Sequence, residues 1–481
     1  MPRSNSRLAL LISCATVLAG CTTVGPNFQR PAASADAGYA MAGDKAPAEA
    51  RLAPDQRAAG AWWRAFGDPA LDQVMTEALA GNQTVAEADA NLARAEAQAA
   101  GVAGSLKPKV DLNAGAQRER INVSSFGFSG FPNPTISLYS IGGVVSYDLD
   151  LFGGGRRQVE GANARTEALS RRADAAYLTV TGNVALQAMR IASLRAQIAV
   201  AREIVADDQR NIDIVDAAEA AGGEAPAAVA TGTAQLAQDQ AQIAPLEQQL
   251  AEARHALALL VGKSPAEWAA PDFEFERLTP PAEVPVSLPS ELVRRRPDIL
   301  AAEADVHAAT ADIGVATARL YPDVRLSANL TQSALSPDKL FSWNTSGYSL
   351  GAGLAAPIYN GGQLRADKRA AEAAARASLA RYRQTVLTAF TQVSDVMSAI
   401  ANDDERLKAL RLAERAAQSS LNDNRAAYRL GGGALLPVVA AQRRLNEARR
   451  ARVEAEGQRM MDIVRLYSAT AADWREAAAK P

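Results

Sequence analysis

The chain has 481 residues, and its 51 basic and 53 acidic side chains give a formal charge of −2. A charge so close to zero gives no general attraction to nucleic acid. The sequence holds two cysteines, Cys14 and Cys21, and we expect only Cys21 to remain in the mature chain, which excludes an internal disulfide or thiolate metal site. The alanine-rich, aromatic-poor composition favours long helices over a compact α/β core.

Residues 1–20 have the layout of a bacterial lipoprotein signal peptide. Arg3 and Arg7 precede an apolar run, residues 8–18, that is shorter than the roughly 20 residues of a membrane-spanning helix. The run ends in Leu18-Ala19-Gly20-Cys21, the spacing at which the cysteine thiol is acylated and becomes the mature N-terminus. An ordinary signal peptide with a chance cysteine is the alternative. We expect residues 21–61 to form an extended segment with a lipid anchor at Cys21.

The rest of the chain is an internal twofold repeat. The segment near Lys107-Pro108 aligns without gaps on the segment near Tyr321-Pro322, at an offset of about 214 residues. In both halves a helical segment leads to two alternating segments, a glycine pair, a very long helix, a turn and a further helix. We therefore expect a first repeat at 62–268, a linker at 269–287, a second repeat at 288–474 and a tail at 475–481.

Four alternating segments, two in each half, predict β-strands. Apolar side chains alternate with polar ones near residues 109–117, 139–151, 323–330 and 348–358, a length that suits the roughly 9 to 11 residues of a tilted membrane strand. Two soluble hairpins with one wet face are the alternative, and the lipoprotein signal favours membrane strands. The polar side chains then become candidates for the water-filled lumen of a barrel: Lys109, Asp111, Asn113, Asp323, Arg325 and Asn329.

Two long helices carry a seven-residue apolar repeat. Residues 364–430 contain neither Pro nor Gly and could reach on the order of 100 Å as a helix. A strict heptad period predicts coiled-coil packing, and the charges between the seams exclude helices that cross a membrane. The repeat in the first half is Tyr177, Val184, Ile191, Ile198, Val205 and Ile212, with Val180, Leu194 and Val215 in a second seam; the later half has Leu379, Val386, Val393, Ile400 and Leu407.

Closure of the sheet requires further chains, because four strands would leave open edges in lipid. Two copies would give eight strands and a filled bore, and three would give twelve strands and a lumen wide enough for water. The sequence pattern by itself does not choose between these.

Other motifs have simpler interpretations. Pro297 suits the first position of a helix, which disfavours Arg294-Arg295-Arg296 as a nucleic-acid site. Trp62-Trp63 is expected to pack a helix rather than form a ligand box, and the glycines at 153–155 and 361–362 to turn a strand into a helix rather than cradle phosphate. Neither His255 nor His307 stands in a recognisable catalytic or metal-binding pattern, and we expect no enzymatic activity and no cofactor.

Three segments in order resemble the TolC-like outer-membrane factor family, in its NodT-type lipoprotein branch: residues 23–31 (TVGPNFQRP), 62–71 (WWRAFGDPAL) and 288–299 (LPSELVRRRPDI). The resemblance implies a mixed α+β membrane protein, a homotrimer with a 12-stranded outer-membrane barrel of four strands per chain, continued by a long periplasmic helical barrel. It also implies that the protein lies in the outer membrane of a Gram-negative bacterium. The partners that it implies are outer-membrane lipid, a periplasmic adaptor and an inner-membrane pump, usually of the resistance-nodulation-division class.

The resemblance implies passive conduction of small molecules, such as drugs and toxic compounds, from the pump to the exterior. A type I protein secretion channel is the alternative within the same class. In a different class, a lipid-anchored coiled-coil structural lipoprotein would explain the signal and the heptads, and the four symmetrically placed alternating segments disfavour it.

The turns between the long helices, near 220–226 and 430–436, are expected at the periplasmic tip. Family members typically carry aspartates just after these turns, whereas this chain has Ala228, Pro437 and Ala440 there. Exposed coiled-coil charges are the plain interpretation of the polar residues nearby. As a hypothesis, the charges that could gate the tube instead are Asp213, Asp216, Glu219, Glu224, Arg425 and Arg429.

Overall fold

The structure is a computed structural model, and it describes residues 23–32, 39, 41, 52–54, 61–122, 125, 127, 130, 132–281, 284–286 and 289–470. The predicted signal peptide, Cys21 and the tail at 475–481 lie outside the described residues. The chain divides into two compact units, the first built from Met1–Pro31, Asn91–Leu169 and Ala301–Tyr382, and the second from the rest. Each unit thus takes corresponding pieces from both repeats.

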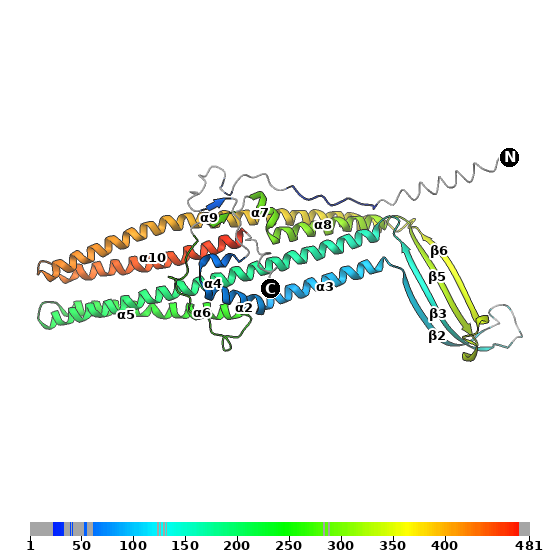
Figure 1. The fold of residues 1–481 in the computed structure, drawn as a ribbon, viewed down its shortest axis with the longest axis horizontal. Helices are drawn as coiled ribbons and strands as arrows, with labels where there is room; N and C mark the ends of the chain where they lie inside the picture. The colour runs from blue at the N-terminus through cyan, green and yellow to red at the C-terminus, as the bar shows by residue number, and fades with distance from the viewer. Residues whose placement is uncertain are drawn as a thin grey trace. The chain divides into compact units, whose positions relative to one another are not determined.

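The first unit contains an antiparallel sheet of four strands in the order β2-β3-β5-β6 (Figure 1). The strands are β2 (Lys109–Arg120), β3 (Thr135–Leu149), β5 (Asp323–Ala334) and β6 (Ser346–Ala355). Each repeat contributes one hairpin, and the pairing of β3 with β5 joins the two hairpins. The four predicted strands are confirmed. They could be predicted because a sheet with one polar and one apolar face requires polar and apolar side chains to alternate along each strand.

Two strands end a few residues earlier than the alternation predicted. After β3, the Asp150 carboxylate accepts hydrogen bonds from the backbone N–H groups of Gly155 and Arg156, at 3.0 and 2.9 Å, and so caps helix α4 (Gly154–Ala220). After β6, Pro357 lacks the N–H that a continuing strand would need. Gly153, Gly361 and Gly362 have positive φ angles of 76°, 63° and 85°, as predicted for glycines at the corners between a strand and a helix.

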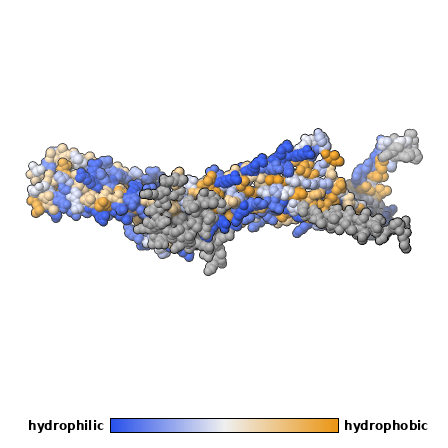
Figure 2. Space-filling model, turned by 90° about the horizontal axis from the view of Figure 1, so that it is seen from above, coloured by the Kyte–Doolittle hydropathy of each residue, from blue (hydrophilic) through white to orange (hydrophobic). Residues whose placement is uncertain are grey.

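The long helices α4 and α9 (Gln363–Arg429) have 67 residues each. The predicted heptad seams are buried or half-buried, with Val184, Ile191 and Val393 fully covered and Val205 and Ile400 half-buried, which confirms coiled-coil packing. Hydrophilic side chains spread over the visible helix surfaces, between smaller apolar patches (Figure 2). Within the described residues, no helix is both long and apolar enough to cross a membrane. The other main helices are α3 (Gln83–Ser105), α5 (Pro226–Ala241), α6 (Ile243–Val261), α8 (Pro297–Ala318) and α10 (Leu435–Ala469).

The second unit has an aromatic core beside its shorter elements. Trp62, in the 3₁₀ helix η1 (Trp62–Phe66), is buried and stacks on Tyr467 with ring centroids 5.2 Å apart. Asp68 then caps helix α2 (Pro69–Gly81) by accepting from the Ala70 N–H at 2.8 Å. The tryptophans therefore pack helices, as predicted. The same unit holds the short parallel pair β1 (Leu52–Pro54) and β4 (Val284–Val286), and α7 (Pro289–Arg295).

Candidate functional site

One face of the four-stranded sheet carries mainly polar side chains and glycines, with Ile136, Leu138 and Val144 of β3 as the large apolar exceptions. Arg325 lies directly opposite Asp148, and its Nε donates to the Asp148 carboxylate at 2.5 Å, which fixes the face that both side chains share. Ser146, two residues before Asp148, lies opposite Lys109 on the same face. Counting by twos along the register places all six candidate lumen residues on this polar face: Lys109, Asp111, Asn113, Asp323, Arg325 and Asn329.

The opposite face of the sheet is apolar and open. Leu112 and Leu350 are 75% and 79% exposed, and the same face carries Val110, Tyr348 and Leu354, also exposed. A soluble monomer rarely leaves so many large apolar side chains together in water. This face therefore has the character of a surface made for an apolar environment, and the polar face has that of a wet lining.

The sheet has two open edges, and the directions of the two edge strands allow them to pair with each other between copies. β2 and β6 stand at the ends of the strand order, and within the described residues neither pairs with a further strand. Because three successive antiparallel pairings separate them, β2 and β6 run in opposite directions. The β6 edge of one copy can therefore pair antiparallel with the β2 edge of the next, which leaves no unpaired backbone groups.

Residues 23–31, which we call the N-terminal strap, are tied to the first unit at the start of α4. The buried Arg157 guanidinium donates to the Asn27 side-chain oxygen at 2.7 Å, and Phe28 stacks on His307 with ring centroids 4.4 Å apart. Arg30 adds an ion pair to Glu303 at 2.6 Å. The segment that directly follows the predicted lipid site is thus anchored by specific contacts.

The two helix turns lie in the second unit. Ala221–Ala225 and Leu430–Ala434 connect the helix pairs, with Gly222 and Gly431 both at a φ of 75°. Among the gate candidates, Asp213, Asp216, Arg425 and Arg429 are exposed, while Glu219 and Glu224 are half-buried. In the part of the chain that the structure describes, no ion pair joins the four acidic candidates to the two arginines.

Arg425 does take part in a connection between the two helix pairs, through a residue that sequence reasoning missed. Its Nη2 donates to Oε1 of the buried Gln442 at 2.8 Å, and Gln442 Nε2 donates to Asp207 at 3.2 Å and to Asn446 at 2.9 Å. This network joins α4, α9 and α10. The available signal was a pair of amides four residues apart in an otherwise apolar seam, a pattern that fixes helix register.

Beside this network is a cavity of about 580 Å³ between α4, α5 and α10. Ala228 and Ala440, which stand where family aspartates were expected, both line it, together with Glu224. The cavity wall also includes the carboxyl groups of Asp208 and Asp239 and the guanidinium of Arg450. Acidic side chains therefore lie close to Ala228 and Ala440 in space, although these two positions are themselves apolar.

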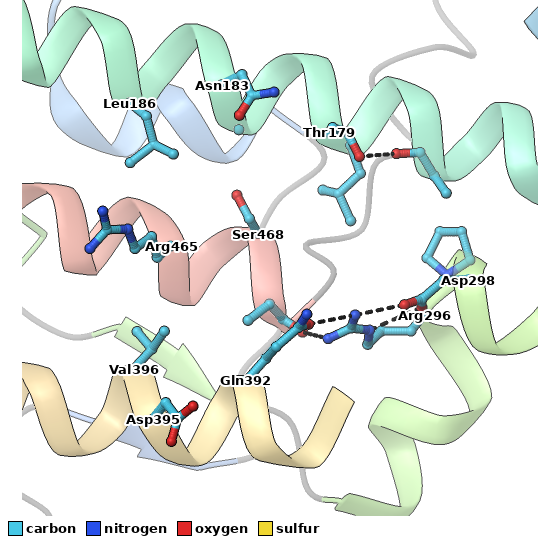
Figure 3. Close-up of a pocket in the computed structure, with 15 residues that line it drawn as sticks. Thr179, Asn183, Leu186, Arg296, Asp298, Gln392, Asp395, Val396, Arg465 and Ser468 are labelled. Carbon is cyan, nitrogen blue, oxygen red and sulfur yellow. Dashed lines mark hydrogen bonds and ion pairs between the residues drawn. The ribbon is translucent and has the colours of Figure 1, made fainter. Parts of the chain in front are cut away.

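A second pocket, of about 500 Å³, is shown in Figure 3. Arg296 is buried beside it and donates to both carboxylate oxygens of Asp298, at 3.0 and 2.6 Å, to Gln392 Oε1 at 2.9 Å and to the Ala469 carbonyl at 3.1 Å. These bonds connect the start of α8, the middle of α9 and the end of α10 (Figure 3). Helix α8 begins at Pro297, as predicted, but the role of Arg296 as a clamp was missed.

The two histidines differ in their surroundings, since His307 packs against other residues and His255 is exposed. His307 Nε2 is 3.0 Å from Glu160, in addition to its stacking on Phe28, while His255 is exposed on α6. No group of three or more His, Cys, Asp or Glu side chains that could hold a metal ion occurs among the described residues.

Comparison with known proteins agrees with this geometry. The family model described as outer membrane efflux protein matches twice, at residues 74–263 and 288–472. The chain is 32% identical over 98% of its length to the pyoverdine export outer membrane protein OpmQ of Pseudomonas aeruginosa, of which 98% is covered. It is 29% identical to the toluene efflux pump outer membrane protein TtgC of Pseudomonas putida, with 98% and 96% of the two chains covered. The solved structure of the outer-membrane channel OprN matches with a TM-score of 0.86 and 29% identity, covering 94% of this chain and 100% of the other.

A sheet with one wet and one apolar face, combined in one chain with paired coiled-coil helices, is typical of an outer-membrane channel component. The chain belongs to the outer membrane efflux protein family. The predicted resemblance and fold class are confirmed, and the chain is the outer-membrane channel subunit of an efflux system in a Gram-negative bacterium.

Proposed function

We propose that three copies of the chain form one tube that conducts small molecules passively and catalyses no reaction. The observation that carries this is the sheet, which has one polar face, one apolar face and two edges that can pair antiparallel. Three copies give twelve strands and a bore wide enough for water, whereas two would give a bore that side chains fill. Lys109, Asp111, Asn113, Asp323, Arg325 and Asn329 line this lumen and keep it hydrated.

The tube receives its cargo from a periplasmic adaptor and an inner-membrane pump of the resistance-nodulation-division class, which supplies the energy. The relatives support a permissive conduit, because those of similar identity are named for export of pyoverdine and for efflux of toluene, which are unlike compounds. Channels of similar sequence thus serve unlike compounds, which supports a lumen that does not select strongly by chemistry. We therefore assign the choice of cargo to the pump.

The test is to insert the detergent-purified protein into planar bilayers and to measure its mass in solution. We expect a trimer and a small resting conductance that grows when the tip is loosened. A monomer that stays silent in the bilayer, even after the tip charges are removed, would exclude the channel.

Arg425→Ala is expected to loosen the tip, because it removes the donor that holds Gln442 and with it the connection to α4. One hydrogen bond from a charged donor contributes about 1 kcal/mol at an exposed site, and three copies act together. Mean conductance in planar bilayers should rise several-fold. Arg415→Ala is the matched control, since Arg415 is exposed on the same helix and no such contact to Gln442 is present. Equal effects of the two substitutions would remove Arg425 from the gate.

Cys21 is proposed as the acylated residue that tethers the trimer to the outer membrane through the N-terminal strap. Cys21→Ser should abolish incorporation of radiolabelled fatty acid, whereas Cys14→Ser should leave it intact, because Cys14 lies within the removed signal. One acyl chain binds a membrane only marginally, and three chains plus a barrel hold the trimer permanently. Continued labelling of the Cys21→Ser protein would refute the assignment.

A further inference from the structure

Two buried aspartates face each other across the α4–α5 hairpin. Asp208 on α4 is 8% exposed and Asp239 on α5 is 3% exposed. Asp239 is well supplied with donors, since Gln235 Nε2 lies 2.7 Å from its Oδ2 and Arg450 Nη2 lies 2.8 Å from its Oδ1. Asp208 Oδ2, by contrast, has no donor among the described residues, although it is buried.

The α9–α10 hairpin contains a second pair of the same design. Asp403 on α9 is 8% exposed and Asp462 on α10 is 4% exposed. Gln458 Nε2 donates to Asp462 Oδ2 at 2.9 Å, and Arg465 Nη1 donates to Oδ1 at 2.6 Å. Asp403 Oδ2 again has no donor in the described part of the chain.

The two pairs share several features. In each, a glutamine four residues before the second aspartate donates to it, and an arginine donates to its other oxygen. In each, the first aspartate occupies an inner position of the heptad, three residues after Val205 in one helix and three after Ile400 in the other. An aspartate in an apolar seam needs a specific partner.

A shared proton satisfies both pairs. An ionised carboxylate can only accept, whereas a protonated one can donate, and two carboxyl groups that share a buried site do not both ionise. The donors around Asp239 and Asp462 mark these as the ionised members. The oxygens without donors mark Asp208 and Asp403 as the protonated ones, each donating to its partner.

The electrostatic surroundings agree. Burial, together with hydrogen bonding to Asp239 and its charge, raises the pKa of Asp208 to about 7. Burial also acts to raise the pKa of Asp239, but donation from Gln235, Asp208 and Arg450 outweighs it and lowers the pKa. Burial and the neighbouring Asp462 raise the pKa of Asp403 to about 6.

The charged groups around each pair compensate its second ionisation only in part. Near Asp208 these are Arg450, which is already paired with Asp239, and the acidic Asp207; the cavity wall adds Glu224, Arg443, Arg444 and Glu447. Near Asp403 they are Arg406 and Arg459, of which Arg459 is paired with Asp404. The cavity beside Asp208 gives its proton a route to water.

We propose that each helix hairpin holds one buried proton shared between two aspartates, Asp208 with Asp239 and Asp403 with Asp462, and that releasing these protons loosens the hairpins. The folded chain keeps protons that the unfolded chain has already lost above about pH 4. Stability of the hairpins therefore falls as the pH rises from about 4 to 7, and changes little beyond that. The proposal concerns one chain and does not depend on conduction.

Hydrogen exchange of the purified trimer, followed by mass spectrometry from pH 5 to 8 and corrected for intrinsic exchange rates, tests the proposal. Peptides from residues 200–245 should lose protection several-fold as the pH rises. Asp208→Asn should remove this pH dependence and keep the protection that the wild type has at pH 5. The reason is that the amide N–H₂ of Asn can donate to Asp239 as the protonated acid does. Asp403→Asn should do the same for residues 395–470. Asp423→Asn is the control, since Asp423 is exposed on α9, and it should keep the wild-type response.

Infrared spectroscopy gives a second measurement that does not depend on stability. The band of protonated carboxyl groups should be present at pH 5, disappear toward pH 8, and lose intensity in Asp208→Asn and in Asp403→Asn. Flat protection in the wild type, or an Asp208→Asn protein with the full pH dependence, would overturn the proposal. Protection conferred by Na⁺ or Mg²⁺ at constant pH would show a cation site instead, and would overturn it as well.

Discussion

Assembly in the outer membrane is expected to fail when Leu112 is replaced by arginine. Leu112 is on the apolar face of β2 and is 75% exposed in the single chain, as a lipid-facing side chain would be. Arginine on the lipid face of a barrel costs about 2–4 kcal/mol at the bilayer midplane. A trimer would carry this cost three times, which approaches the whole stability of a typical protein. The measurement is the yield of heat-modifiable trimer in isolated outer membranes.

The neighbouring residue supplies the control. Asn113→Arg places the same side chain one position along β2, on the polar face, where the lumen can solvate it. Its trimer yield should stay near that of the wild type. Leu350→Arg and Ser349→Arg repeat the comparison on β6. If the tolerated and the damaging substitutions exchanged places, the assignment of the two faces would be reversed.

The second large effect is expected from Arg296→Ala. The substitution removes four hydrogen bonds from a buried guanidinium and leaves Gln392 and the Ala469 carbonyl without their donor. Loss of such a charged donor costs about 2–3 kcal/mol, a value that allows for the partial exposure of Asp298. Thermal unfolding followed by helical circular dichroism should show a clearly lower midpoint.

Two variants separate the clamp from general charge effects. Arg294→Ala removes an exposed arginine two residues earlier and should leave the midpoint almost unchanged. Arg296→Lys keeps the charge but not the fork that binds both Asp298 oxygens, so it should restore only part of the stability. Full stability of Arg296→Lys would mean that charge alone matters at this position.

The elements of the fold could be predicted because each imposes a period on the sequence. A sheet with one wet face repeats every two residues, and a coiled coil repeats every seven, so β2, β5, α4 and α9 appear directly as patterns. The glycine corners were predictable for a different reason. Only glycine adopts their positive φ angles at no steric cost.

The buried polar contacts could not be predicted, because each joins residues from different helices. Gln442 meets Asp207 only when α10 packs on α4, and Asp239 meets Asp208 only in one register of the α4–α5 hairpin. A charged residue on a helix is usually solvated, so the burial of Asp208 was not predicted. Its inner position in the heptad was the signal that could have singled it out.

The helices α4 and α9 have the same length, 67 residues each, and this limits which insertions and deletions the chain can tolerate. Inserting or deleting seven residues in one helix keeps its seam in phase but shifts its turn along the axis by about 10 Å. The returning helix must change by the same seven residues to keep its pairing. Both repeats must then change together to keep their turns at a common level. Length differences between natural relatives in this region should therefore come in sevens, in all four helical segments at once.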